Sequence, residues 1–261
     1  MIVYILQVVS AMAIIIVLIL FVLRPGKKKR EIIPMTDHYR DLLDNNVAFY
    51  QQLDPEGREK FEQKVQQFLG NVRITGINTT VDDFDRVLIG ASAIIPICAF
   101  PDWEYINLNE VLLYPDSFSH EFEQEGQHRL VAGMVGTGPL QNLMVLSKQA
   151  LRYGFMNNGG HSNTAIHEFV HLIDKTDGYI DGIPEILLKQ PYTLPWVNMM
   201  REKMEEMAKG ESDIDLYGVS SQAEFFAVVS EYFFSRPDLL NEKHPELYAM
   251  LERMFLKKEN G

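Results

Sequence analysis

The pentapeptide His-Glu-Phe-Val-His at 167–171 is the sequence feature that most restricts how this chain can fold. His167 and His171 are four residues apart, a spacing that puts two side chains on one face of an α-helix. Two imidazoles on one face can bind a single metal ion, and Glu168 beside them can take a proton from a metal-bound water. This pattern is typical of zinc metallopeptidases. It predicts a helix here, with a turn and an N-cap at 159–163.

The composition excludes several other classes of protein. With 46% hydrophobic residues, the 261-residue chain has ample material for a packed core. Cys98 is the single cysteine, so an internal disulfide framework and a cysteine-rich zinc site are both excluded. Residues 31–261 contain 19 basic and 36 acidic side chains, a net charge of −17. That charge argues against direct binding of nucleic acid, which requires basic surface.

The first residues predict a membrane anchor. Residues 2–23 are apolar and uncharged, and a helix of that length spans ~33 Å, compared with ~30 Å for the hydrocarbon core of a bilayer. Five basic residues follow at 24–30, whereas a signal peptide would have its charges before the apolar run. The positive-inside rule then predicts a single-pass protein of the bacterial inner (cytoplasmic) membrane with its catalytic domain in the cytoplasm. We predict an anchor at 1–23 and a basic juxtamembrane linker at 24–39.

The remaining residues, 40–261, predict one α+β domain, a mainly helical core with a small mixed sheet. Hydrophobic periodicity indicates helices and short strands along it. The helices are expected at 41–70, with a break at Asp54-Pro55, and at 84–100. A strand or a hairpin is expected at 71–82, and further strands at 109–114 and 142–146. The strand at 142–146 comes shortly before the histidine helix, where it could align a substrate backbone by strand addition. The alternative is an ordinary core strand.

A zinc site needs a third protein ligand, and a second apolar helix at 221–234 supplies candidates. Glu224 and Glu231 are seven residues apart, so they lie on one face of this helix. A buried acid surrounded by apolar neighbours is costly unless a metal or a histidine compensates its charge. The two glutamates are therefore the candidates for a metal ligand and for a group that supports a ligand.

These two helices together resemble the Mlc titration factor A family of zinc peptidases. The resemblance depends on the pentapeptide and on Ala-Glu-Phe-Phe-Ala-Val-Val-Ser-Glu-Tyr-Phe-Phe at 223–234, and it extends to 83–89 and 110–115. That family is in turn similar to the protease domain of anthrax lethal factor, in which a tyrosine precedes the Glu-Phe-Phe motif by seven residues. Tyr217 has that spacing from Glu224.

The resemblance implies a zincin-like metallopeptidase domain with Zn2+ as its cofactor. It assigns His167, His171 and Glu224 as zinc ligands, Glu168 as the general base and Tyr217 as the group that stabilises the oxyanion. Related peptidases often have a second acid four residues after the ligand glutamate, where this chain has Val228. The supporting role is therefore expected of Asp174, three residues after His171, or of Glu231.

Two functions from different classes follow from these expectations. The first is a zinc metallopeptidase that hydrolyses peptide bonds in a peptide or protein substrate. The alternative, implied by the resemblance, is a regulatory protein that sequesters a transcriptional repressor of the Mlc type, with peptidase activity secondary. A third interpretation, a quality-control protease for inner-membrane proteins, depends on the apolar segment alone.

Overall fold

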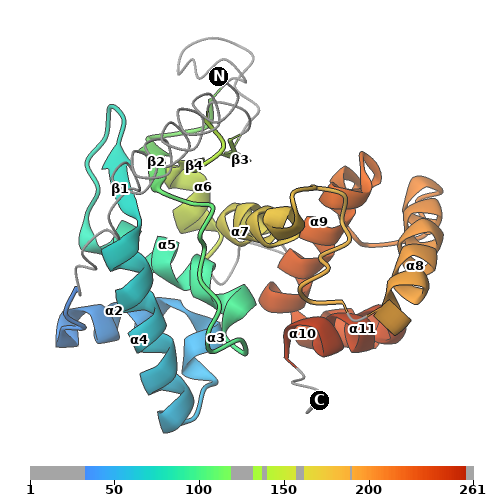
Figure 1. Cartoon of the computed structure of the whole chain (residues 1–261), viewed down its shortest axis with the longest axis horizontal. Coiled ribbons are helices and arrows are strands. Elements are labelled where there is room, and N and C mark those ends of the chain that lie inside the picture. The colour runs from blue at the N-terminus through green and yellow to red at the C-terminus, as the bar shows by residue number, and fades with distance from the viewer. Residues whose placement is uncertain (1–32, 119–131, 137–139, 157–161, 189, 257–261) are drawn as a thin grey trace, which may run out of the picture. The chain divides into compact units, whose positions relative to one another are not determined.

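The computed structural model describes residues 33–118, 132–136, 140–156, 162–188 and 190–256. They belong to a compact unit, Ile32–Gly261, in which a small sheet lies at one side of the helices (Figure 1). The predicted mixture of helices and a small mixed sheet is confirmed. The domain boundaries at 23 and 39 stay predictions.

The helices of the described residues form an N-terminal group packed around α5 and a C-terminal group packed around α9, with α7 between them (Figure 1). The N-terminal group contains α2 (Asp37–Asn46), α3 (Ala48–Gln51), α4 (Pro55–Asn71), α5 (Asp83–Ile94), the 3₁₀ turn η1 (Ile95–Ile97) and α6 (Lys148–Tyr153). The central and C-terminal helices are α7 (Thr164–Asp174), η3 (Lys175–Asp177), α8 (Gln190–Ala208), η4 (Leu216–Val219), α9 (Gln222–Ser235), α10 (Pro237–Lys243) and α11 (Pro245–Phe255).

Local capping explains where the N-terminal helices begin. The Asp54 side chain accepts a hydrogen bond from the Gly57 N–H at 2.7 Å, and Pro55 occupies the first turn of α4. The predicted break at Asp54-Pro55 is therefore confirmed. Helix α5 begins with a capping box in which Asp82 and Asp85 each accept from the other's backbone N–H. The predicted helix at 84–100 is shorter than expected, because α5 ends at Ile94 and a 3₁₀ turn follows.

Among the described residues, the sheet contains four strands in the order β1-β2-β4-β3. They are β1 (Arg73–Gly76), β2 (Glu110–Tyr114), β4 (Leu143–Ser147) and β3 (Gly133–Val135). The first three are parallel, and β3 pairs antiparallel with β4, so that Met134 is opposite Val145. Because β4 is hydrogen-bonded on both edges, it cannot accept a further strand. The expectation that the strand at 142–146 aligns a substrate is therefore wrong, and its alternative, a core strand, is correct.

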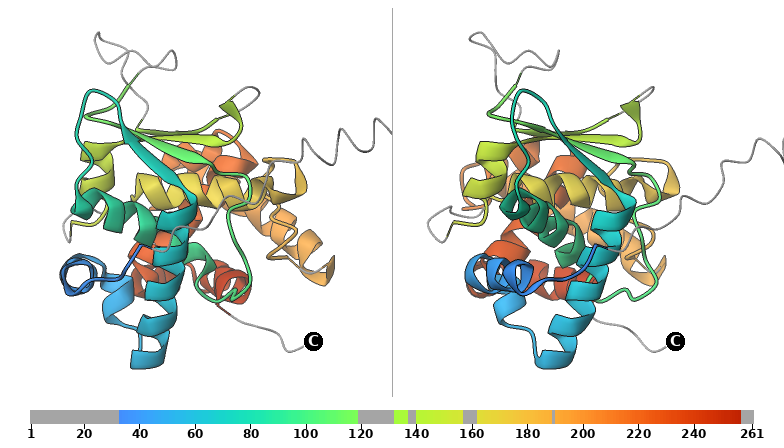
Figure 2. Two further views of the ribbon diagram at one scale, coloured as in Figure 1. Left: turned by 60° about the vertical axis from the view of Figure 1, so that its left-hand side comes forward. Right: turned by 90° about the vertical axis from the view of Figure 1, so that its left-hand side faces the viewer.

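The alternation of side chains in these strands separates two apolar clusters. One face, which includes Val111, Leu113, Met144 and Leu146, belongs to the main core, and helix α7 runs along this side of the sheet (Figure 2). The other face contributes to a small cluster formed by Tyr114, Phe118 and Val145, with Ile77, Leu112 and Met134 against it. Every residue of α7 after its first is buried, so α7 is the central helix of the unit.

The described residues do not support membrane attachment. Within them, no helix has both the length and the apolar character that crossing a bilayer requires. This finding contradicts the predicted localisation, which is therefore wrong. The prediction was a single-pass protein of the bacterial inner membrane with a cytoplasmic catalytic domain. The apolar segment 1–23 that prompted it lies outside the described residues, as do residues 24–32 of the basic linker.

Candidate metal centre

Helix α7 places both histidines of the pentapeptide at one site. Asn163 is its N-cap: the Asn163 side-chain oxygen accepts from the Ile166 N–H at 3.1 Å, and its amide donates to the Gly154 carbonyl at 3.2 Å. The cap fixes where the helix starts, and the spacing of four residues then stacks the His167 and His171 rings with centroids 4.7 Å apart. The predicted helix and its cap are therefore present.

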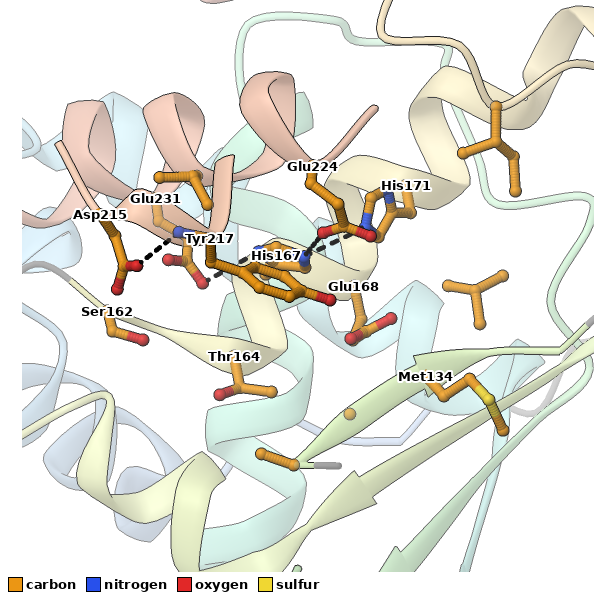
Figure 3. Close-up of a pocket in the computed structure, with 15 residues that line it drawn as sticks. Met134, Ser162, Thr164, His167, Glu168, His171, Asp215, Tyr217, Glu224 and Glu231 are labelled. Atoms are coloured by element: carbon orange, nitrogen blue, oxygen red, sulfur yellow. Dashed lines mark hydrogen bonds and ion pairs between the residues drawn. The ribbon is translucent and has the colours of Figure 1, made fainter. Parts of the chain in front are cut away.

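Helix α9 brings Glu224 to the same place. Its N-cap is Ser221, whose hydroxyl accepts from the Glu224 N–H at 3.1 Å, so Glu224 lies in the first turn. Glu224 Oε2 is 2.9 Å from His167 Nε2 and 3.4 Å from His171 Nε2. The two Nε2 atoms are 3.0 Å apart, and the three side chains point toward one another (Figure 3).

These three groups fit a divalent metal. Ligand atoms on a tetrahedron with bonds of ~2.0–2.1 Å lie ~3.3 Å apart, close to the observed separations of 2.9, 3.0 and 3.4 Å. Two imidazole nitrogens that face each other at 3.0 Å also require a cation or a shared proton between them, because their lone pairs would otherwise repel. Imidazole nitrogen and carboxylate oxygen are ligand types that zinc accepts in catalytic sites.

The electrostatics of the cluster favour a bound cation. Burial raises the pKa of Glu224, but its hydrogen bonds to His167 and His171 outweigh this and lower the pKa to about 2. Burial lowers the pKa of His167, yet its contacts with Glu224 and Glu231 raise it to about 10. A position that binds a proton this firmly has the negative potential that would attract a metal ion.

Glu168 is buried beside the cluster and beneath the edge strand β3. A Cβ atom added at Gly133 of β3 would lie 2.7 Å from Glu168 Cγ and 2.7 Å from Thr164 Cγ2, so a larger residue there would displace one of these side chains. Burial raises the pKa of Glu168, and the charges of His167 and His171 act in the opposite direction. The carboxylate is thus held in a largely buried position next to both imidazoles.

Tyr217 lies on η4, the turn before α9, and it is 57% exposed. Its ring centroid is 6.0 Å from that of His167, and its hydroxyl points into the pocket on the side of Glu168 (Figure 3). The Asp215 carboxylate accepts a hydrogen bond from the Tyr217 N–H at 2.9 Å and orders this turn. Burial, followed by the charges of Glu224 and Glu168, raises the pKa of the Tyr217 hydroxyl, which therefore stays protonated at neutral pH.

The two candidates for a supporting acid have different partners. Glu231 Oε1 lies 3.3 Å from His167 Nδ1, the ring nitrogen that faces away from the cluster. Asp174 Oδ2 instead accepts from the Gly182 N–H at 2.8 Å, and its other oxygen has no hydrogen bond within the described residues. His171 Nδ1 also has no partner there. Burial is the main cause that raises the pKa of Asp174 to about 6, against the Gly182 hydrogen bond.

The cluster opens into a cleft of about 570 Å³. The cleft contains all the predicted site residues except Asp174, and it adds Ala132, Gly133, Met134, Val135, Ser162, Thr164, Ile180, Asp215 and Val228. Sequence reasoning missed most of these additions. The three residues of β3 are too few to show an alternation, and Ile180 lies in an irregular loop. The Asp-x-Tyr spacing of Asp215 and Tyr217 was the available signal, since it is typical of a side chain that caps a turn.

The sequence of this chain matches the profile of the family described as "Glucose-regulated metallo-peptidase M90" over residues 23–256. The chain belongs to the M90 metallopeptidase family. The resemblance to Mlc titration factor A is confirmed by the same match and by individual relatives. Membership of this family implies a divalent metal, and His167, His171 and Glu224 form the group of metal-ligating side chains found among the described residues of this M90 chain.

Curated relatives cover most of the chain at low identity. An uncharacterized protein from Synechocystis sp. is 28% identical over 237 residues, which are 85% of this chain and 84% of the relative. Mlc titration factor A from Pectobacterium atrosepticum is 26% identical over 246 residues, 88% of this chain and 90% of the relative. The protein of that name from Edwardsiella ictaluri is 34% identical over 163 residues, 56% and 59% of the two chains.

Proposed function

We propose that this M90 chain is a zinc-dependent peptidase that hydrolyses peptide bonds, with His167, His171 and Glu224 as the zinc ligands. The observation that supports this most is the convergence of the three side chains from α7 and α9 at the base of a cleft, with Glu168 beside them. When bound there, zinc would polarise the scissile carbonyl and lower the pKa of a water molecule.

Glu168 is the proposed general base. Its carboxylate lines the cleft next to both histidines, so it can take the proton of the attacking water and pass it to the leaving amine. A general base works best when its pKa approaches the operating pH, and the burial that raises the pKa of Glu168 acts in that direction.

Tyr217 is the proposed oxyanion donor. Its phenol stays protonated at neutral pH because burial raises its pKa. A neutral O–H donor near the reacting carbonyl stabilises the negative charge that develops there without becoming charged itself. The exposure of Tyr217 fits this role, because a side chain at the rim of the cleft can close on a substrate.

Strand β3 is the proposed guide for the substrate main chain. It pairs with β4 on one edge, and its other edge has no strand partner within the described residues. Its first residue, Gly133, lies against Glu168, so a peptide paired with β3 would pass the catalytic groups. Lys175, at the end of α7, donates to the carbonyls of Gly136 and Gln141 at 2.9 and 3.3 Å and holds this hairpin in place.

Replacement of Glu168 by glutamine tests the proposal. Glu168→Gln keeps the shape of the side chain and removes the base, so we expect a fall in kcat of about 10²–10⁴-fold on a peptide substrate, with zinc still bound at one ion per chain. Glu59→Gln on α4, outside the cleft, is the matched control and should leave both quantities unchanged. Retained peptidase activity in Glu168→Gln would refute this mechanism.

A second function is favoured by the names of the relatives. Several are named Mlc titration factor A, which suggests that this chain also binds a transcriptional repressor of the Mlc type. The two functions are separable by experiment: binding of a purified repressor of that type would be measured with wild type, Glu168→Gln and zinc-depleted protein. Repressor binding that survives both treatments would support a regulatory role independent of hydrolysis. The absence of binding in wild type would refute the second function.

A further inference from the structure

Gly182 lies in the loop between η3 and α8, where it connects the end of the histidine helix to two other elements. Its N–H donates to Asp174 Oδ2 at 2.8 Å, and its carbonyl accepts from Trp196 Nε1 at 2.7 Å. Asp174 is the last residue of α7, and Trp196 belongs to α8. Both side chains are fully buried, so the backbone of Gly182 is held on two sides.

The third side of Gly182 faces the start of α9. Its φ of +77° is in the left-handed region that favours glycine. A Cβ added there would lie 2.6 Å from the carbonyl carbon of Gln222 and 3.1 Å from the nitrogen of Ala223. Gln222 is the first residue of α9, and Glu224 is the third. The backbone of Gly182 is therefore in direct contact with the turn that positions Glu224.

We infer that Gly182 is a positioning residue for the metal centre: it sets how closely the first turn of α9 approaches the end of α7, and so how far Glu224 lies from the two imidazoles. The inference rests on the proposed zinc site. A backbone contact of this kind cannot be relieved by rotation of a side chain. Since ordinary contacts begin at 3.4 Å, an added methyl group would displace the neighbouring backbone by on the order of 1 Å, compared with a tolerance of ~0.2 Å for metal–ligand distances.

The rival explanation is that α7 and α9 hold the ligands in place by their own packing. The two helices are in extensive contact, and the α9 residues from Phe225 to Phe233 are buried. In that case the Gly182 contact would affect folding alone. The two explanations differ in one measurable quantity, the affinity of the folded protein for zinc.

The experiment compares Gly182→Ala with Gly210→Ala in the full chain. Gly210, at the end of α8, has a nearly identical φ of +75°, but nothing lies within 4 Å of its added Cβ. The two variants therefore share the cost of alanine in the left-handed region, and only the first disturbs α9. Zinc affinity would be measured by competition with a chelator, and the free energy of unfolding of the zinc-free protein by urea denaturation.

We expect Gly182→Ala to bind zinc about 10–100-fold more weakly than wild type, the range found for groups that orient metal ligands, and Gly210→Ala to bind it as wild type does. Unchanged zinc affinity in Gly182→Ala, even with lowered stability, would overturn the inference alone. Wild-type protein that binds no zinc would refute the proposed function and the inference together. If Gly182→Ala does not fold, Trp196→Phe is compared with Phe226→Leu, because Trp196→Phe removes the donor to the Gly182 carbonyl and also reduces the packing against Phe226 of α9. Zinc binding weakened in Trp196→Phe alone supports the inference, whereas unchanged binding in Trp196→Phe, or equal weakening in both variants, overturns it.

Discussion

Tyr217 is an exposed side chain of the cleft, 57% accessible, and within the described residues its hydroxyl has no hydrogen-bond partner. If it donates to the oxyanion, Tyr217→Phe removes a contact that exists only in the transition state. We expect kcat to fall by about 10²–10³-fold while KM stays near the wild-type value. Tyr179→Phe, an exposed tyrosine of the neighbouring loop, is the control. A change confined to KM would mean that Tyr217 only binds the substrate.

Glu231 contacts His167 at the ring nitrogen opposite the proposed zinc-binding nitrogen. Its carboxylate faces His167 Nδ1 at 3.3 Å, so it fixes the orientation of the ring and raises its basicity. Glu231→Gln should lower zinc affinity by about 10–100-fold, measured by chelator competition. Glu242→Gln, an exposed glutamate on α10, should have no effect. Equal zinc affinities in the two variants would show that the Glu231 contact is a structural ion pair.

At the scale of single residues, the sequence predicted which residues of one helix lie together better than it predicted contacts between helices and loops. The spacing of His167 and His171, or of Glu224 and Glu231, follows from helical geometry, and all four lie together. The partner of Asp174 did not follow, because Gly182 is in a loop whose path the spacing does not determine. The same holds for Gly133, whose contact with Glu168 depends on the order of the strands.

At the scale of elements, two helix starts were predictable and strand order was not. The first helix, expected from residue 41, begins earlier, at Asp37. Asp54-Pro55 and Asn163 are local signals, since a capping side chain bonds to a backbone N–H only a few residues ahead. The sheet depends on pairings between distant segments, and the antiparallel strand β3 lies between β2 and β4 in the sequence but at the edge of the sheet. A strand of three residues has too little alternation to be recognised in a sequence. The sequence therefore predicted substrate alignment by the strand at 142–146, which is β4, and the role is now proposed for β3.

Helices α5 and α6 are joined by a buried carboxylate. Asp85 is fully buried; it accepts from Arg152 Nε at 2.8 Å and forms an ion pair with Lys148 Nζ at 2.9 Å. Asp85→Ala would leave Lys148 and Arg152 with the more exposed Asp82 as their remaining shared acid, and it would remove one half of the α5 capping box. We expect the free energy of unfolding to fall by about 3 kcal/mol, the lower end for a buried pair because both cations are partly exposed.

Urea denaturation of the zinc-free protein measures this change, with an unchanged m value as the sign that the unfolding transition is otherwise the same. Asp41→Ala, an exposed acid on α2, is the control and should alter stability by less than about 0.5 kcal/mol. If the free energy of unfolding fell in Asp85→Ala by no more than in this control, Lys148 and Arg152 would have recovered their interactions elsewhere.

At the scale of the whole molecule, Asp213 joins the segment before η4 to the C-terminal helices. Its carboxylate accepts from the Tyr232 hydroxyl of α9, from Lys243 Nζ of α10 and from His244 Nε2, each at 2.8 Å. Burial raises the pKa of Asp213, but hydrogen bonds to Lys243, His244 and Tyr232 outweigh it and hold the pKa well below its usual value. The segment it anchors continues directly into Asp215 and Tyr217 of the cleft.

This shift predicts how stability depends on pH. Because the pKa of Asp213 is lower in the folded than in the unfolded protein, its stabilisation is fully present above the unfolded value of ~3.9 and is lost as the pH falls below it toward the folded value. Asp213→Asn should therefore be less stable at pH 7 and should lose less stability than wild type between pH 5 and pH 2. Urea denaturation across that range tests this, with the exposed Asp238→Asn as control; parallel curves for wild type and Asp213→Asn would contradict it.

The short edge strand β3 has a consequence for the choice of target. A strand guide recognises main-chain N–H and C=O groups, and a helix or an interior strand of a folded protein has already used these groups. With three residues in β3, a matching target needs only a brief extended stretch, but that stretch must be free of its own structure. The protein would then select its targets mainly by backbone conformation and only secondarily by side-chain identity. The rate at which a folded protein is cut would follow the free energy of its local opening, and destabilised or unfolded chains would be consumed first.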